Sequence, residues 1–218
     1  MNSSPSSIDA LLLLAPGCPH CPTVLDGLGQ LVKQGLLGRL EVVNIASHPE
    51  TASELGVRSV PWVRIGEFEL QGAHSPGELK LWAERATAPD GVALYIRELL
   101  SAGQLASTIA LVRRHPDWLK AALSLLADKD SGMALKTGLA ALIEEFTGSK
   151  LLIAQIDTLA QLLTHPHHGI RADACYFLGL CHSPQALPYL QQAVSDAHSE
   201  VQEIARDALV ELSQMGIN

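Results

Sequence analysis

Several residue types are scarce in this sequence, and each scarcity argues against particular fold classes or functions. Aromatic residues make up 4% of the chain although hydrophobic residues make up 47%. A core must therefore be built from aliphatic side chains, which suits closely packed helices better than a β-sandwich. Four cysteines in 218 residues are too few for the disulfide scaffold of a small secreted domain. No apolar run approaches the roughly 20 residues that span a bilayer.

Basic residues are also too few for a nucleic-acid-binding protein. The chain has 15 Lys and Arg against 23 Asp and Glu, a formal net charge of −8, whereas phosphate binding needs clustered Lys and Arg. Residues 1–7 lack Lys and Arg, and the apolar run Leu11–Leu14 is too short for the core of a signal peptide. We therefore expect a cytoplasmic protein that neither binds nucleic acid nor spans a membrane.

The motif Cys18-Pro19-His20-Cys21 is the most informative stretch of the chain. It lies between the apolar run and the start of a helical pattern. Unpaired N–H groups and the positive dipole end of that helix favour an anion, so the pKa of the Cys18 thiol should fall. His20 adds a second donor to that thiolate. A thiolate attacks disulfides and a nearby second thiol releases the mixed disulfide, so the motif indicates a redox-active dithiol.

A structural zinc site uses the same cysteine spacing and is the alternative interpretation. Zinc would need two more ligands, and neither a second CxxC nor an HxxxH pair follows nearby. Zinc or an iron–sulfur cluster would therefore require ligands from a second copy of the chain. We predict no metal and no cofactor.

Residues 8–88 alternate between strand and helix patterns. Strand patterns cover residues 8–15, 40–46, 60–66 and 67–71, and helical patterns cover 22–34, 49–55 and a stretch that begins near 75. The last helix opens with Ser75-Pro76-Gly77-Glu78, which matches a capping box with proline in the first turn. The predicted order is β-α-β-α-β-β-α.

This order, the CPHC motif and the segment Gly56-Val57-Arg58-Ser59-Val60-Pro61 resemble the thioredoxin fold over residues 8 to 88. The resemblance implies that Pro61 is a cis-proline facing the active-site sulfurs and that the Val60 backbone holds a substrate chain. It also implies that Gly72 ends the last strand. Taken without the family, Pro61 would be an ordinary trans proline, because only about 5–6% of X–Pro bonds are cis.

Three positions depart from the thioredoxin pattern. Gly17 stands where thioredoxins usually carry a tryptophan, and Leu12 lies about where they place a buried acidic residue that helps to deprotonate the second cysteine. The dipeptide Pro19-His20 is typical of the DsbA-type oxidants. By this resemblance the Cys18 thiolate should be more stabilised, and the couple should lie between about −270 and −120 mV.

The second half of the chain contains helical patterns only, beginning after the break at residues 87–91. Ile170–Ala174 and Val201–Ala205 lie 31 residues apart, as do His167 and His198. Helix pairs of this period stack into solenoids, and residues 183–190 resemble the short HEAT-like repeats of bacterial proteins. The predicted architecture is an α/β thioredoxin fold over residues 1–88, followed by an all-α HEAT-like helical solenoid over residues 91–218.

Other candidate residues in the second half have simpler interpretations. Cys175 and Cys181 are six residues apart on one predicted helix and therefore point about 120° away from each other, so we expect buried, unpaired thiols. Four imidazoles offer a second candidate metal site: His165, His167, His168 and His182. No cysteine or carboxylate completes that set at standard spacing, so we expect a turn with solvated imidazoles.

Two functions compete. In the first, the protein is a thiol-disulfide oxidoreductase in which Cys18 exchanges with a substrate disulfide and Cys21 resolves the mixed disulfide. Val60 and Pro61 would hold the substrate chain, and the helical repeats would bind a protein partner. In the second, the chain is a protein-interaction module with a redox-sensing or vestigial thioredoxin-like domain. The intact cysteine pair favours the first, because a docking domain needs neither sulfur. Cys18, Pro19, His20 and Cys21 are the predicted catalytic residues.

Overall fold

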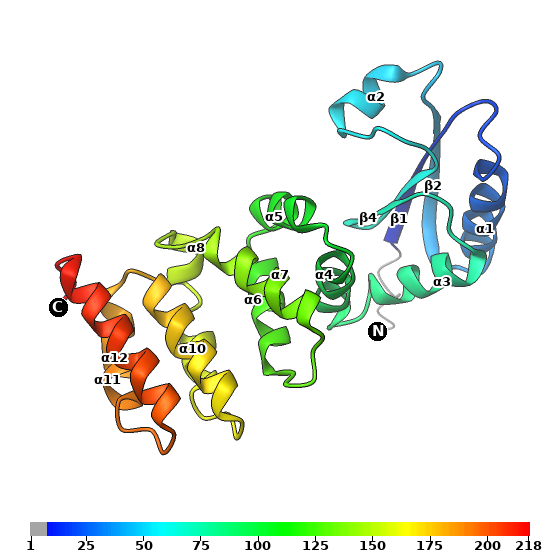
Figure 1. The fold of residues 1–218 in the computed structure, drawn as a ribbon. Helices are drawn as coiled ribbons and strands as arrows, with labels where there is room; N and C mark the ends of the chain where they lie inside the picture. The colour runs from blue at the N-terminus through cyan, green and yellow to red at the C-terminus, as the bar shows by residue number, and fades with distance from the viewer. Residues whose placement is uncertain (1–7) are drawn as a thin grey trace, which may run out of the picture. The chain divides into compact units, whose positions relative to one another are not determined.

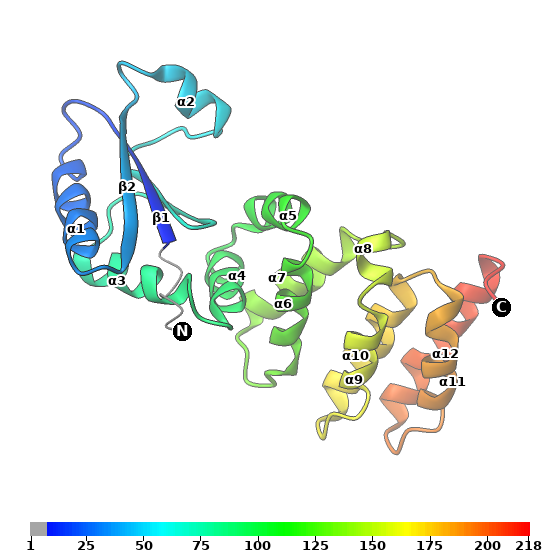
Figure 2. The ribbon, with the colours of Figure 1, turned by 180° about the vertical axis from the view of Figure 1, so that it is seen from behind.

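The computed structural model describes residues 8–218. The chain divides into two compact units, of which the first ends at Gly91 and the second begins at Val92. All strands lie in the first unit, whereas the second is helical (Figures 1 and 2). Within the described range, no helix combines the length and the apolar character that crossing a membrane requires.

The first unit has the predicted order of elements. They are β1 (Ile8–Leu14), α1 (Cys21–Lys33), β2 (Leu37–Asn44), α2 (Pro49–Glu54), β3 (Trp62–Ile65), β4 (Phe68–Gln71) and α3 (Pro76–Arg85). The strands form one mixed sheet in the order β2-β1-β3-β4, in which β1 is parallel to β2 and antiparallel to β3. Parallel neighbours need a crossover connection, which α1 supplies.

The side chains of β1 alternate between the two faces of the sheet, and both faces are covered. One face carries a cluster formed by Leu11, Leu13, Ala52 of α2 and Trp62. Leu12 points to the opposite face and is fully buried. On that face the rings of Phe68 and Trp82 of α3 meet edge to face, 5.7 Å between centroids. Figure 1 shows α1 beside α3, away from α2.

Local sequence fixes how α1 and α3 meet. The predicted capping box of α3 is confirmed: Ser75 Oγ accepts a hydrogen bond from the Glu78 N–H (3.3 Å), and Glu78 Oε2 accepts one from the Ser75 N–H (2.7 Å). The two helices approach closely at Gly27, where a Cβ atom would lie 2.9 Å from Leu79 Cδ1. This packing holds α1, and with it the CPHC motif, against the sheet.

The second unit consists of helices joined by short turns. They are α4 (Gly91–Ser101), α5 (Leu105–Arg114), α6 (Trp118–Ser124), η1 (Leu125–Ala127), α7 (Met133–Glu144), α8 (Lys150–Ile153), α9 (Ile156–Leu162), α10 (His168–Leu180), η2 (Pro184–Ala186), α11 (Leu187–Ala193) and α12 (Ser199–Gln214). The sequence pattern of residues 150–164 predicts one continuous helix, and this is wrong in one detail, because the helix is broken at Ala154 and Gln155. Leu152 and Ile156 are buried on either side of the break, so the turn is compatible with the packing of both side chains.

Residues 31 positions apart in sequence share their environment in the last four helices. Leu159 and Leu190 are both fully buried, as are Ala174 and Ala205. α10 packs against α12, and Gly179 permits the close approach, since a Cβ atom there would lie 3.0 Å from the Ala208 Cβ.

Candidate functional site

A tight turn carries the chain from β1 to the first cysteine. The Cys18 N–H donates to the Ala15 carbonyl (3.3 Å), and Gly17 has a φ of +78°. Proline at the second position and a positive φ at the third are typical of a type II turn, which favours glycine over a residue with a Cβ. The turn therefore accounts physically for glycine at position 17.

The two cysteines of the motif are joined by a disulfide, with 5.5 Å between their Cα atoms. Cys18 lies before the helix and is half-buried, whereas Cys21 is the first residue of α1 and is 4% exposed. Pro19 and His20 between them are exposed. An external thiol can therefore approach Cys18 far more readily than Cys21.

The start of α1 leaves its backbone donors available to an anion. His20 is the N-cap residue, and within the described residues no side chain caps the helix or places an acid in its first turn. The first N–H groups of a helix lack intrahelical partners, and the dipole adds partial positive charge there. This environment favours the thiolate form of a nearby cysteine.

The Val60–Pro61 peptide bond is cis, which confirms the expectation for Pro61. Pro61 is buried, and its carbonyl accepts a hydrogen bond from the Gly72 N–H (2.9 Å). Trp62 pairs with Leu13 in the antiparallel β1–β3 ladder. The start of β3 therefore lies at the same edge of the sheet as the end of β1, where the CPHC segment begins.

The buried acid that thioredoxins use is missing from this site. Leu12 is 0% exposed. Among residues 8–218 the buried polar residues are Thr108 and Ser183, both in the second unit. A carboxylate buried behind the disulfide is thus absent from the described residues.

The second pair of cysteines lies in an environment that disfavours reaction of the thiols. Cys175 and Cys181 are free thiols, each 0% exposed. Burial raises the pKa of Cys175 to about 11 and that of Cys181 to about 12. The Cys181 thiol also lies 3.4 Å from the Phe177 carbonyl oxygen, to which it donates. The expected buried thiols are confirmed.

The four histidines considered from the sequence do not gather into one group. His182 lies beside Gly148, where a Cβ atom would be 3.2 Å from its Nδ1. His168 instead meets His198, ring on ring at 3.7 Å between centroids, and the carboxylate of Glu200. Sequence reasoning did not find Glu200 as a neighbour of His168. The signal that could have suggested this contact was the 31-residue offset between His167 and His198.

The first unit is similar in sequence to known proteins. Residues 10–84 match the family described as Thioredoxin domain. A thioredoxin from Methanocaldococcus jannaschii is 31% identical over 72 residues, which cover 31% of this chain and 82% of that protein. The family match ends within α3, before the helical unit begins.

Proposed function

The chain belongs to the thioredoxin family, and we propose that it is a protein thiol-disulfide oxidoreductase that works through Cys18 and Cys21. The observation that carries this proposal is the disulfide between an accessible cysteine and a buried one at the head of α1. That asymmetry gives the two sulfurs different roles.

In the reduced protein, the Cys18 thiolate attacks one sulfur of a substrate disulfide. A Cys18–substrate disulfide forms and the other substrate sulfur leaves as a thiolate. The Cys21 sulfur, after loss of its proton, then attacks the Cys18 sulfur and releases the second substrate thiolate. Two electrons have passed to the substrate, and the protein carries the Cys18–Cys21 disulfide. The same steps in reverse oxidise a substrate dithiol.

The neighbouring residues would support these steps. The free N–H groups of α1 and a hydrogen bond from His20 would stabilise the Cys18 thiolate, and Pro19 would hold the short loop between the sulfurs. The Val60 backbone, next to Pro61, would hydrogen-bond an extended substrate chain. Without a buried acid near Leu12, the proton of Cys21 would pass to water or to the departing thiolate.

Single cysteine variants test the roles of the two sulfurs. Cys18→Ser should abolish exchange with a disulfide-bonded test protein, because the attacking sulfur is gone. Cys21→Ser should still attack but should accumulate the mixed disulfide, which mass spectrometry detects. Cys175→Ser is the matched control and should keep the wild-type rate. Equal residual turnover in the Cys18 and Cys21 variants would contradict the proposal.

We also propose that the second unit is a HEAT-like solenoid that binds protein partners. Polar contacts between residues 31 or 32 apart support a regular stack: Arg97–Asp128, Arg113–Glu145, Glu144–Tyr176, Asp157–Tyr189 and His168–Glu200. Such a series is expected when successive units of that length pack with the same geometry.

Exposed apolar side chains on this unit offer a test of partner binding. Met133 is 79% exposed and Val210 is 55% exposed. In the Cys21→Ser background, Val210→Glu should reduce trapping of protein partners while exchange with a small disulfide stays unchanged. Trapping at the level of the Cys21→Ser parent in both the Val210→Glu and the Met133→Glu variants would remove the basis for a partner-binding role.

A further inference from the structure

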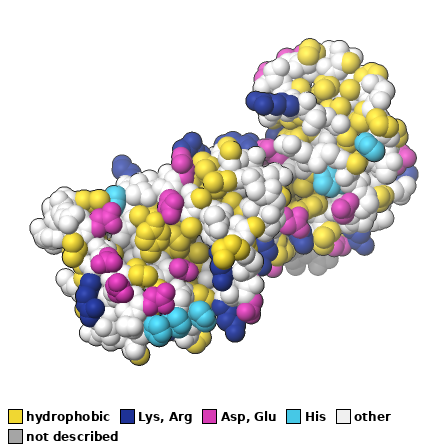
Figure 3. All heavy atoms as spheres, viewed as in Figure 1, with side chains coloured by type: hydrophobic (Ala, Val, Ile, Leu, Met, Phe, Trp, Pro, Cys, Tyr) yellow, Lys and Arg dark blue, Asp and Glu magenta, His cyan; other side chains and the backbone are white. Residues whose placement is uncertain are grey.

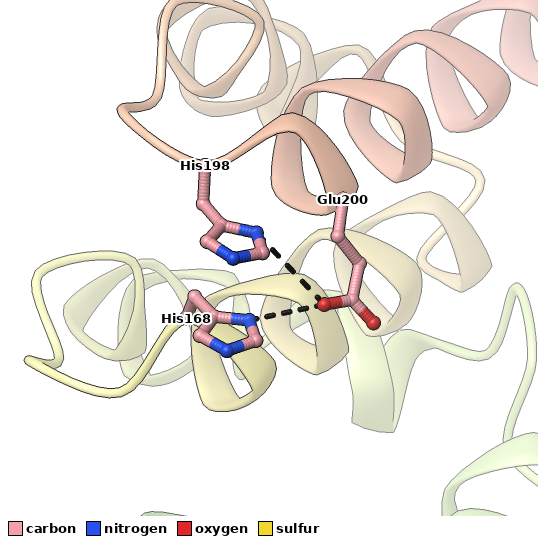
Figure 4. A group of neighbouring side chains, drawn as sticks. All are labelled: His168, His198 and Glu200. Atoms are coloured by element: carbon pink, nitrogen blue, oxygen red, sulfur yellow. Dashed lines mark hydrogen bonds and ion pairs between the residues drawn. The ribbon is translucent and has the colours of Figure 1, made fainter.

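We propose that His168, His198 and Glu200 form a binding site for a divalent transition metal ion of the zinc type. One ligand atom from each residue lies within 4.8 Å of the others. Glu200 Oε2 is 3.0 Å from His168 Nδ1 and 4.0 Å from His198 Nδ1. Figure 4 shows the carboxylate directed between the two rings, and Figure 3 shows adjacent histidines at the surface of the helical unit.

The three residues come from the starts of two neighbouring helices. His168 is the first residue of α10, His198 is the N-cap of α12, and Glu200 lies in the first turn of α12. α10 and α12 pack side by side, which brings the two starts together. The site is therefore a product of the repeat: residues about 30 apart in sequence meet because one helix pair stacks on the next.

Arg171 holds in place the two turns that carry the imidazoles. Its guanidinium donates two hydrogen bonds of 2.8 Å to the carboxylate of Asp196 and a third of 2.8 Å to the His165 carbonyl. Asp196 Oδ1 in turn accepts the N–H of His198 (2.8 Å). The Arg171 and Asp196 side chains are only 14% and 13% exposed. This clamp fixes the backbone on both sides, as the outer shell of a metal site does.

One candidate ligand atom, His198 Nδ1, is buried and has no hydrogen-bond partner. A buried nitrogen without a partner carries an uncompensated desolvation cost, and a bond to a metal ion would remove that cost. The two rings lie nearly parallel, 8° between their planes, so each must turn before both lone pairs meet one ion. Their side chains are 42% and 44% exposed, which leaves room for that rotation.

The donor types select the class of ion. Two imidazole nitrogens and one carboxylate oxygen are a ligand set that zinc accepts with a fourth position open to water. Calcium and magnesium prefer ligands that are all oxygen. The positive ends of α10 and α12 oppose a cation, and the charge of Glu200 counteracts that effect. From the sequence we expected no metal at these histidines, because no carboxylate completed the set of ligands. Glu200 supplies that carboxylate.

The chain contains its own control for this site. His48 and Glu50 repeat the arrangement of His198 and Glu200, with the imidazole at the N-cap of a helix and the acid two residues later. His48 Nδ1 lies 3.1 Å from Glu50 Oε1. No second imidazole joins this pair among the metal-ligand groups of residues 8–218. A single exposed His–Glu pair should bind zinc weakly, so His48→Gln should have no effect.

The test is a titration of the full-length, tag-free protein with Zn²⁺ by calorimetry, with Co²⁺ as a spectroscopic probe. The protein is kept in its Cys18–Cys21 disulfide form, so that no thiolate of the CPHC motif can bind the metal. We expect one ion per chain. His168→Gln, His198→Gln and Glu200→Gln should each weaken binding at least about tenfold, while His48→Gln should match the wild type.

Two results would overturn the proposal: no Zn²⁺ bound by the oxidised wild-type protein, or binding with the wild-type affinity in all three site variants. Circular dichroism of each variant reports whether the helices are retained. If a histidine variant fails to fold, Glu200→Gln decides, because this exposed residue keeps its size and loses only its charge. The disulfide-exchange activity of Cys18 does not enter this test, so the two proposals fail independently.

Discussion

The molecule contains two pairs of cysteines, and their positions relative to a helix separate them chemically. Cys18 and Cys21 stand at the start of α1, where one sulfur is accessible and backbone donors are unpaired. Cys175 and Cys181 lie within and at the end of α10, fully buried, and their pKa values are raised by desolvation to about 11 and about 12. The first setting favours a reactive thiolate, whereas in the second the side chain packs as a small hydrophobe.

The comparison predicts a large difference in alkylation of the reduced protein. With pKa values of about 11 and about 12, roughly one Cys175 thiol in 1,000 and one Cys181 thiol in 10,000 is ionised at pH 8. A thiol with the ordinary pKa of about 8.5 is ionised to about a quarter at pH 8, and the helix start should raise that fraction at Cys18. Mass spectrometry after brief iodoacetamide treatment should find Cys18 modified at least about 200 times faster than Cys175.

The pH dependence sharpens this contrast. Because a raised pKa delays deprotonation, the rates at Cys175 and Cys181 should keep rising about tenfold per pH unit above pH 9, whereas the rate at Cys18 should level off. Urea should remove the difference by exposing all four thiols. A buried thiol that reacts as fast as Cys18 in the native protein would contradict this difference between the two cysteine pairs.

A second test separates the turn before Cys18 from the helix after it, using two glycine-to-alanine variants. Gly17 has a positive φ, so Gly17→Ala should destabilise the protein by about 1 kcal/mol. Gly29 lies within α1, and a Cβ atom there would meet no atom within 4 Å. Gly29→Ala should therefore stabilise by about 0.5–1 kcal/mol. Urea unfolding measures both values, and equal signs would contradict the type II turn.

The smallest expected effect concerns His20. His20→Gln removes the imidazole two residues after Cys18 but keeps an exposed polar side chain at the N-cap. An exposed electrostatic interaction contributes about 0.2–1 kcal/mol, so alkylation of Cys18 at pH 6.5 should slow by a factor of about 1.4 to 5. An unchanged rate would assign thiolate stabilisation to the helix start alone.

The fold of the first unit could be predicted from the sequence because its signals are local. Alternating strand and helix patterns, the capping box at Ser75 and the CPHC motif each depend on a few neighbouring residues. The cis geometry of Val60–Pro61 could not be derived this way, since the local preference is trans. Only the resemblance to thioredoxins predicted it.

Features that depend on tertiary packing were harder to predict. The break between α8 and α9 contains neither glycine nor proline, so the sequence pattern continues through it. The meeting of His168 and Glu200 requires α10 to lie beside α12 in one particular register. The 31-residue offset between similar sequence segments was the signal that could have found this contact, because it relates the starts of the two helices.

The most direct test of the central claim is a redox titration of the full-length protein in glutathione buffers, with the state of each cysteine read by mass spectrometry. We predict one two-electron transition confined to Cys18 and Cys21, with a potential between about −270 and −120 mV. Cys175 and Cys181 should remain thiols throughout. If Cys18 and Cys21 form no disulfide at any ratio of oxidised to reduced glutathione, the protein is not an oxidoreductase of this kind.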